Sequence, residues 1–388
     1  MTQKIFKKLA TLLSFLLIFS LVAAPSLAPV SVYASTAFSE YDGSFDYAAV
    51  SLEPKAVNQI GSYASLSPSE LKSIKLYPGG IPFGVKFMTE GILIVGFCDI
   101  DQGNKKINPS SNAGLRMGDR IISVNGKELL SASELTDAVE KSGGKTLSIE
   151  YLRGDGKYTA KLTPAYSQSE GCYKTGIYVK DNGAGIGTVT YIDPETLSFA
   201  GLGHGICEGE GGRLVPIQRG SVVDVCINGV IKGQCGTPGE VKGYFRAGKL
   251  GSLLKNTDCG VFGVYATLPK NLPVEPLSLG LRNEVKEGKA YIWCTLDEGT
   301  PQRYEIEISN IDRGASAGKC FSVKVTDAAL LSKTGGIVQG MSGSPIIQNG
   351  KLIGAVTHVL INDPTAGYGI FIENMLAAGQ SGVMPRAA

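Results

Sequence analysis

The chain has 388 residues, 43% of them hydrophobic and 19% charged, which is the composition of a globular protein long enough for two domains. Its formal net charge is +2, and loss of the first 34 residues with their three lysines would bring it to about −1. Because no basic excess is present to neutralise phosphates, nucleic acid is not an expected partner. The 51 glycines, together with many Val, Ile and Thr residues, favour short strands joined by tight turns.

The N-terminus has the pattern of a targeting segment. Three lysines precede an apolar run at residues 9–24, and V-Y-A before Ser35 is a plausible cleavage site. This run is shorter than the roughly 20 residues that a spanning helix needs. We therefore expect residues 1–34 to be a signal peptide or N-terminal membrane anchor, with the rest of the chain exported. Residues 35–74 are polar and aperiodic, and we interpret them as a lead-in segment.

Residues 75–166 alternate strand-like and helix-like patterns. Two apolar runs (79–97) are followed by NAGLRMGDRIISVNG, a serine-capped helix pattern SASELTDAVEKS, and the strand patterns LSIEYLR and YTAKLTP. This order resembles a PDZ domain of the kind attached to bacterial proteases. The resemblance implies that Phe83, Gly84 and Val85 form a loop whose backbone N–H groups bind a peptide's terminal carboxylate, while the peptide adds as an extra strand.

Residues 170–388 contain roughly a dozen short apolar segments separated by glycines, which predicts a β-barrel or a pair of sandwiches. Only ENMLAAGQ near the end has a helical pattern. With the PDZ-like region, the predicted fold is mainly β: a small α+β PDZ domain followed by a larger β domain.

One serine stands in the turn-forming sequence G-M-S-G-S-P, and a nucleophilic serine needs a base within hydrogen-bond reach and donors for the oxyanion. Chymotrypsin-like proteases have a similar turn, and this resemblance implies that the amides of Gly340 and Ser342 form an oxyanion hole. It also implies that the PDZ domain is followed by a chymotrypsin-like double β-barrel peptidase domain. The chain has two histidines. His204 follows a strand–turn–strand pattern and is the expected base, whereas His358 is expected to line the cleft or to pack in the barrel.

The third member of a triad is less clearly marked. Spacing between His204 and Ser342 favours Asp258 over Asp327, and Asp224 and Asp363 are weaker candidates.

No metal or other cofactor is expected. The eight cysteines include no C-x-x-C pair, and two histidines offer little to a zinc site. Export permits disulfides, but the spacing fixes no pairing.

A longer resemblance covers almost the whole chain. The run TGGIVQGMSGSPIIQNGKLIGAVTHVLINDPTAGYGIFIENML, the sequence GLGHGI and the upstream PDZ pattern resemble the SpoIVB peptidases, serine peptidase family S55. The resemblance implies that His204 is the catalytic histidine and Ser342 the nucleophile. It also implies that the acid is Asp327, which places Asp327 ahead of Asp258.

The same resemblance implies a biological role. It describes an exported serine endopeptidase of the forespore intermembrane space, with or without a membrane tether before processing. The enzyme cleaves itself and then a membrane-bound regulator of an intramembrane protease, which triggers processing of a late sporulation sigma factor.

Other functions have weaker support. A non-catalytic PDZ adaptor with a degenerate protease-like domain is the main alternative, and Ser342→Ala would discriminate the two. The S-x-x-K match at Ser252 lies in a β-rich region, although penicillin-binding enzymes need it on a helix. The glycine-rich runs at 183–187 and 201–205 lack the full dinucleotide-binding pattern.

Overall fold

The computed structural model describes residues 63, 66–103, 105–208 and 212–380. The expected signal segment and most of the lead-in lie outside these ranges. Within them, the lead-in contributes helix α3 (Pro68–Ser73), which begins after a capping box formed by Ser67 and Glu70. In this part of the chain no helix is both long enough and apolar enough to cross a membrane.

The first barrel is a closed ring of six strands. In chain order they are β2 (Pro82–Phe97), β11 (Ile177–Ile192), β12 (Ser198–Gly201), β15 (Ile217–Ile231), β16 (Glu240–Thr257) and β17 (Gly260–Tyr265). Around the ring the order is β2-β11-β12-β17-β16-β15, and β2 pairs with both β11 and β15. Two short strands, β1 (Lys75–Pro78) and β18 (Leu277–Ser278), extend from β11. The core holds large apolar side chains, among them Phe83, Phe199 and Tyr265.

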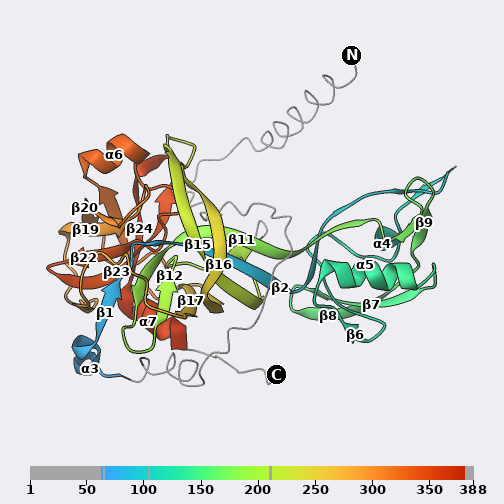
Figure 1. Cartoon of the computed structure of the whole chain (residues 1–388), viewed down its shortest axis with the longest axis horizontal. Coiled ribbons are helices and arrows are strands. Elements are labelled where there is room, and N and C mark those ends of the chain that lie inside the picture. Colours follow the sequence, from blue (N-terminus) through green and yellow to red (C-terminus); the bar gives the residue numbers. More distant parts are fainter. Residues whose placement is uncertain (1–62, 64–65, 104, 209–211, 381–388) are drawn as a thin grey trace, which may run out of the picture. The chain divides into compact units, whose positions relative to one another are not determined.

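The second barrel is also closed. Its strands belong to the part of the chain drawn in orange and red in Figure 1. Its strands are β19 (Gly288–Cys294), β20 (Gln302–Ser309), β21 (Phe321–Val325), β22 (Pro345–Gln348), β23 (Lys351–Leu360) and β24 (Asp363–Phe371). The ring order is β19-β20-β21-β24-β23-β22. If the strands of each barrel are numbered 1 to 6 along the chain, both rings read 1-2-3-6-5-4. Helix α6 (Ala328–Thr334) lies between the third and fourth strands, and α7 (Ile372–Gln380) follows the sixth.

The PDZ region is inserted between the first and second strands of the first barrel. Its sheet continues from the far half of β2 through β5 (Arg120–Val124), β7 (Leu147–Arg153) and β8 (Gly156–Leu162). Helix α5 (Ala132–Lys141) is capped by Ser131 and buries Leu135 and Val139 against this sheet, as the sequence pattern predicts. The remaining short elements are β3 (Ile100–Asp101), β4 (Lys106–Ile107), α4 (Pro109–Asn112), β6 (Lys127–Glu128), β9 (Ala165–Ser167), β10 (Cys172–Lys174), β13 (Cys207–Glu208) and β14 (Arg213–Leu214).

The predicted fold class is confirmed: the chain is mainly β, with a PDZ domain and a chymotrypsin-like pair of barrels. One assignment within it was wrong. Phe83, Gly84 and Val85 do not form the carboxylate-binding loop of the PDZ domain. They lie inside β2, paired with β11 on one side, while Gly84 and Val85 also pair with β15 on the other. Phe83 and Val85 are buried in the first barrel's core, so the region from 75 to 89 belongs to that barrel and not to the PDZ domain.

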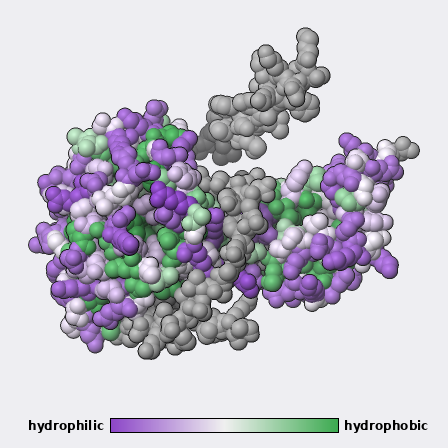
Figure 2. Space-filling model, viewed as in Figure 1, coloured by the Kyte–Doolittle hydropathy of each residue, from purple (hydrophilic) through white to green (hydrophobic). Residues whose placement is uncertain are grey.

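The visible face of the molecule carries mainly hydrophilic residues, with apolar residues in scattered groups between them (Figure 2). The side chains that carry the predicted chemistry contribute little to the surface, because His204, Ser342 and His358 are each 5% exposed.

Candidate active site

Ser342 lies on the connection between the third and fourth strands of the second barrel. Two glycines with positive φ flank it, Gly340 at 96° and Gly343 at 94°. Residues with side chains rarely adopt these angles, so the glycines allow the chain to turn sharply around the serine. The Ser342 hydroxyl donates a 2.7 Å hydrogen bond to the carbonyl oxygen of Thr357 on β23.

Strand β11 of the first barrel holds the serine loop from the other side. The backbone N–H of Thr188 donates to the Ser342 carbonyl oxygen at 3.1 Å, and the Thr188 hydroxyl donates to the Gly340 carbonyl at 2.7 Å. The hydroxyl of Thr190 donates to the Gly343 carbonyl at 2.8 Å. Three hydrogen bonds from one strand therefore fix the loop that carries the serine to the first barrel.

The four backbone amides from Gly340 to Gly343 differ in their hydrogen bonding. The Met341 N–H donates to Val338 and the Gly343 N–H to Val356, at 3.1 and 2.8 Å. Within the described part of the chain, the amides of Gly340 and Ser342 donate to no backbone carbonyl. These are the two donors that the sequence pattern assigns to an oxyanion hole.

His204 lies on the connection between the third and fourth strands of the first barrel, three residues after the end of β12. Leu202 and Gly203 both have positive φ, at 67° and 68°, which turns the chain so that the imidazole is buried. The ring Nδ1 lies 2.9 Å from the Gly205 carbonyl oxygen. Since a carbonyl only accepts, Nδ1 carries the proton and Nε2 is the basic nitrogen. Burial lowers the pKa of His204, and the Gly205 carbonyl partly opposes this shift.

The serine and histidine loops meet at Thr357 and His358. A Cβ placed on Gly203 would lie 2.9 Å from the Thr357 side chain, so the histidine loop packs directly against the residue that binds the Ser342 hydroxyl. The His204 and His358 rings lie with centroids 5.1 Å apart and planes inclined by 37°. Burial, with smaller effects from His204 and Lys319, lowers the pKa of His358 to about 3, so both rings are neutral at physiological pH.

His204 Nε2 is buried and has no hydrogen-bond partner among the described residues. The Ser342 hydroxyl donates to Thr357 instead. The structure thus brings the serine and the histidine to one junction between the barrels, joined through Thr357 and His358. For a proton to pass from serine to histidine, the hydroxyl must turn away from the Thr357 carbonyl.

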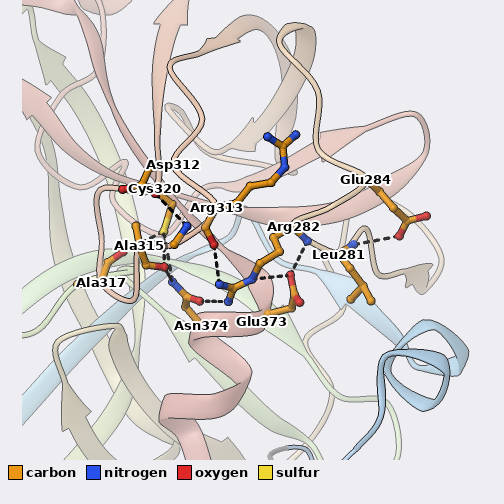
Figure 3. A network of polar contacts seen from close by, with 11 residues as sticks. Leu281, Arg282, Glu284, Asp312, Arg313, Ala315, Ala317, Cys320, Glu373 and Asn374 are labelled. Carbon is orange, nitrogen blue, oxygen red and sulfur yellow. Dashed lines mark hydrogen bonds and ion pairs between the residues drawn. The ribbon is translucent and has the colours of Figure 1, made fainter.

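A loop at residues 312–320 packs against this junction and is anchored by a polar network (Figure 3). Gly318 accepts a hydrogen bond from the Thr357 hydroxyl, and its Cα carries no side chain that would approach the His358 ring. Asn374 donates to the Ala315 carbonyl at 3.0 Å, and its own side-chain oxygen accepts from Arg282 at 2.6 Å. Helix α7 therefore helps to fix the wall beside the two histidines.

The carboxylates predicted as triad members lie apart from the imidazole. Asp327 caps α6: one oxygen accepts from the backbone N–H groups of Ala329 and Leu330 at 2.9 and 3.0 Å, and the other accepts from Glu305 N–H. Asp258 is exposed in the turn between β16 and β17, one residue after Thr257. The Thr257 carbonyl is within 2.9 Å of the Cβ position of Gly205, so this turn lies beside the histidine loop.

The two weaker acid candidates have other partners. Asp224 forms an ion pair with Arg246 at 3.6 Å, and Asp363 accepts from the backbone N–H and the hydroxyl of Thr365 at the start of β24.

Sequence reasoning missed several positioning residues. Thr188, Thr190 and Thr357 hold the serine loop, yet threonines on strands are common and give no specific signal. Asn256 is a similar case: its side chain binds Ile206 N–H and the carbonyls of Ile206 and Val215, which fixes the chain just after His204.

All eight cysteines are free thiols in this structure. Burial, above all, raises the pKa of Cys259 to about 11, so this thiol is a poor nucleophile. The described residues contain no group of three or more His, Cys, Asp or Glu side chains placed to hold a metal ion.

Similar solved structures and curated proteins were found for parts of the chain. Residues 93–163 match the family model of the PDZ domain. Serine protease HTRA1 of Xenopus tropicalis and that of Xenopus laevis are each 41% identical to this chain over 56 residues, 14% of this chain and 12% of theirs. The chain thus spans only a small part of the length of these curated relatives.

Among solved structures, the active form of the Rv3671c protease from M. tuberculosis is 14% identical, with a TM-score of 0.31, and the match covers 53% of this chain and 77% of that one. The PDZ domain of an SdrC-like protein from Listeria monocytogenes is 22% identical, with a TM-score of 0.19, over 23% of this chain and 87% of that one.

The chain also matches a peptidase family. Residues 171–376 match the family model described as SpoIVB peptidase S55. This range is more than half of the chain and includes every strand of both barrels except β2, as well as His204, Asp327 and Ser342. The chain therefore belongs to the SpoIVB peptidase S55 family.

Proposed function

We propose that this protein is a serine endopeptidase in which Ser342 is the nucleophile and His204 the general base. The observation that carries the proposal is the shared location of the two residues. Each lies on the third-to-fourth-strand connection of its barrel, and the two connections touch at Thr357. Family membership supports the same residues.

In the proposed reaction, the Ser342 oxygen attacks the scissile carbonyl carbon while its proton passes to His204 Nε2. The Gly340 and Ser342 amides donate to the oxyanion. The imidazolium then protonates the leaving amine, and a water molecule repeats the sequence on the acyl-enzyme, which releases the acid product and the serine. Burial of His204 supports this role, because its lowered pKa keeps Nε2 unprotonated at neutral pH.

The resemblance to the family assigns the orienting acid to Asp327, and we retain this assignment as part of the proposal. In the structure, the Asp327 carboxylate binds backbone amides, and the Gly205 carbonyl is the partner of His204 Nδ1. Asp327 would therefore have to leave at least one amide to reach the imidazole. Asp258 is the alternative, since its turn lies beside the histidine loop.

The test is labelling with a serine-directed phosphonate, combined with turnover of a peptide pool. We expect the parent chain to react, and the Ser342→Ala and His204→Ala variants to lose labelling and hydrolysis. Labelling that persists in Ser342→Ala would remove Ser342 as the nucleophile.

One observation favours a second function, a PDZ adaptor with an inactive protease fold: the Ser342 hydroxyl binds Thr357 and not His204. A parent chain that stays unlabelled while its fold is intact would support that function.

For the biological role, we propose export across a membrane into the forespore intermembrane space, self-cleavage, and then cleavage of a membrane-bound regulator that controls sigma-factor processing late in sporulation. Family membership supports this role. N-terminal sequencing of the matured protein would test export and self-cleavage together. In an endospore-forming host, replacement of Ser342 by Ala should block both self-cleavage and sigma-factor processing, and normal processing would refute the role.

A further inference from the structure

The N-terminal part of β11 forms an additional strand on the PDZ sheet. Residues 177–180 pair antiparallel with 93–97 of β2, with Tyr178 opposite Gly96 and Lys180 opposite Leu93. On its other edge, the same part of β2 pairs with β5 of the PDZ sheet. Peptide ligands of PDZ domains bind as an extra antiparallel strand at a sheet edge of this kind.

The side chains of this segment alternate as those of a bound peptide do. Ile177 and Val179 pack against the PDZ core, whose members include Leu135 and Val139 of helix α5. Tyr178 lies on the opposite face and is 60% exposed. The segment therefore occupies the position between β2 and α5 with its apolar residues facing inward.

A carboxylate ends this segment. The Asp181 side chain accepts a 2.6 Å hydrogen bond from the backbone N–H of Ala132, the first residue of α5. The Thr89 hydroxyl lies 3.2 Å from the Asp181 carbonyl oxygen, at a break in the pairing of β2 with β11. The Asp181 carboxylate thus lies where β11 meets β2 and the N-terminus of α5.

The opposite end of β11 holds the serine loop. Thr188 and Thr190, which bind the carbonyls of Gly340, Ser342 and Gly343, follow Asp181 on the same strand. Thr188 lies seven positions after Asp181, which is about 23 Å of extended chain. One continuous strand therefore joins the PDZ groove to the loop of the proposed nucleophile.

We propose that residues 177–181 are an internal ligand of the PDZ groove, which must leave before an external peptide binds there, and that β11 couples occupancy of the groove to the Ser342 loop. The external ligand that fits is a peptide with branched apolar side chains at alternate positions and a carboxylate at its end. An effect of this coupling on catalysis rests on the proposed function, whereas occupancy of the groove by residues 177–181 does not.

The test uses the full chain with Ser342→Ala as background, so that its result does not depend on whether the protein hydrolyses peptides. The probe is a fluorescein-labelled peptide of sequence KTGIYVKD, residues 174–181, with a free terminal carboxylate. Fluorescence polarisation measures its binding to the background chain and to the Val179→Ala and Asp181→Ala variants. Tyr178→Ala is the matched control, because it alters the same segment on its exposed face.

We expect the peptide to bind both loosened variants at least about tenfold more tightly than it binds the background chain or the control, because apparent affinity scales with the fraction of open groove. Equal binding by all four chains would overturn the proposal. The proposal would also be overturned if Val179→Ala and Asp181→Ala bound the peptide no more tightly than the background chain does while their PDZ domain stayed intact. Protection of the β7 and β8 amides from hydrogen exchange shows that the domain is intact.

Hydrogen exchange in the same chains tests the coupling. We expect Val179→Ala to accelerate exchange at the Thr188 and Gly343 amides, both of which lie in or against the serine loop, and Tyr178→Ala to leave them unchanged. If residues 177–180 exchange faster in Val179→Ala but Thr188 and Gly343 do not, the coupling is refuted.

Discussion

Gly343 offers the sharpest test of how the two barrels meet. A Cβ added there would lie 2.1 Å from the Thr188 carbonyl oxygen and 2.5 Å from the Leu202 nitrogen, both of them backbone atoms of the first barrel. Backbone atoms of paired strands have little freedom to move away. Gly343 also has a φ of 94°, so an alanine would be strained even in open space.

Comparison with Gly350 separates the two destabilising effects of Gly343→Ala, backbone strain and overlap with the first barrel. Gly350 has a φ of 75° in the turn between β22 and β23, and a Cβ there would have no atom within 4 Å. Gly350→Ala should therefore cost only the backbone strain, about 1–2 kcal/mol. Gly343→Ala adds the overlap with the first barrel, and overpacking of this kind typically costs about 1–3 kcal/mol. We expect a difference of about 1–3 kcal/mol between the two variants.

Urea denaturation of both variants in the Ser342→Ala background measures the free energy of unfolding. Phosphonate labelling of both variants with Ser342 present measures the reactivity of this serine. We expect Gly343→Ala to be the less stable variant and to lose labelling, and Gly350→Ala to be labelled at the parent rate. Equal midpoints and equal labelling rates would refute the contact between the serine loop and the first barrel.

Three further predictions concern His204, His358 and Asp327. Because burial lowers the pKa of His204, the acidic limb of kcat/KM should fall below pH 6.5, and a limb above that value would contradict a buried base. His358 has a pKa of about 3 when folded and about 6.5 when unfolded, so the unfolded chain binds the extra proton between these values. The free energy of unfolding should therefore decrease as the pH is lowered through this range, by about 2 kcal/mol from pH 6.5 to pH 5. His358→Gln should flatten this pH dependence in urea titrations. Asp327→Ala should lose about 1 kcal/mol through the α6 cap. Asp327→Asn should keep the cap but lose turnover, and near-parent turnover alongside a defective Asp258→Asn would transfer the acid role to Asp258.

The sequence predicted the elements that depend on local pattern. Strands separated by glycines, the serine-capped helix α5 and the terminal helix α7 all follow from periodicity and capping residues. The sequence also predicted the turn at the serine, because G-M-S-G-S-P places glycines where the backbone needs positive φ.

The error at Phe83, Gly84 and Val85 has a physical cause. An apolar-glycine-apolar triplet is compatible with an amide-donating loop, but also with a strand in which glycine makes room for a neighbour. Gly84 is of the second kind, since a Cβ there would lie 2.6 Å from Val223 and 2.7 Å from Phe245. Local sequence cannot distinguish the two, because the neighbours come from residues more than 100 positions later.

The topology explains why the candidate site forms where it does. In a ring ordered 1-2-3-6-5-4, the third and fourth strands are not neighbours, so the chain between them must cross one end of the barrel. Crossing segments are irregular, and the chain can turn sharply within them. Leu202, Gly203, Gly340 and Gly343 adopt positive φ in these two segments. The side chains of His204 and Ser342 are buried next to these turns. Since both barrels use the same order, each supplies one such crossing, and these carry His204 and Ser342. Asp327 lies on the second crossing and Asp258 on a hairpin turn of the first barrel. The acid variants therefore test whether the crossings alone supply the chemistry or whether a hairpin contributes as well.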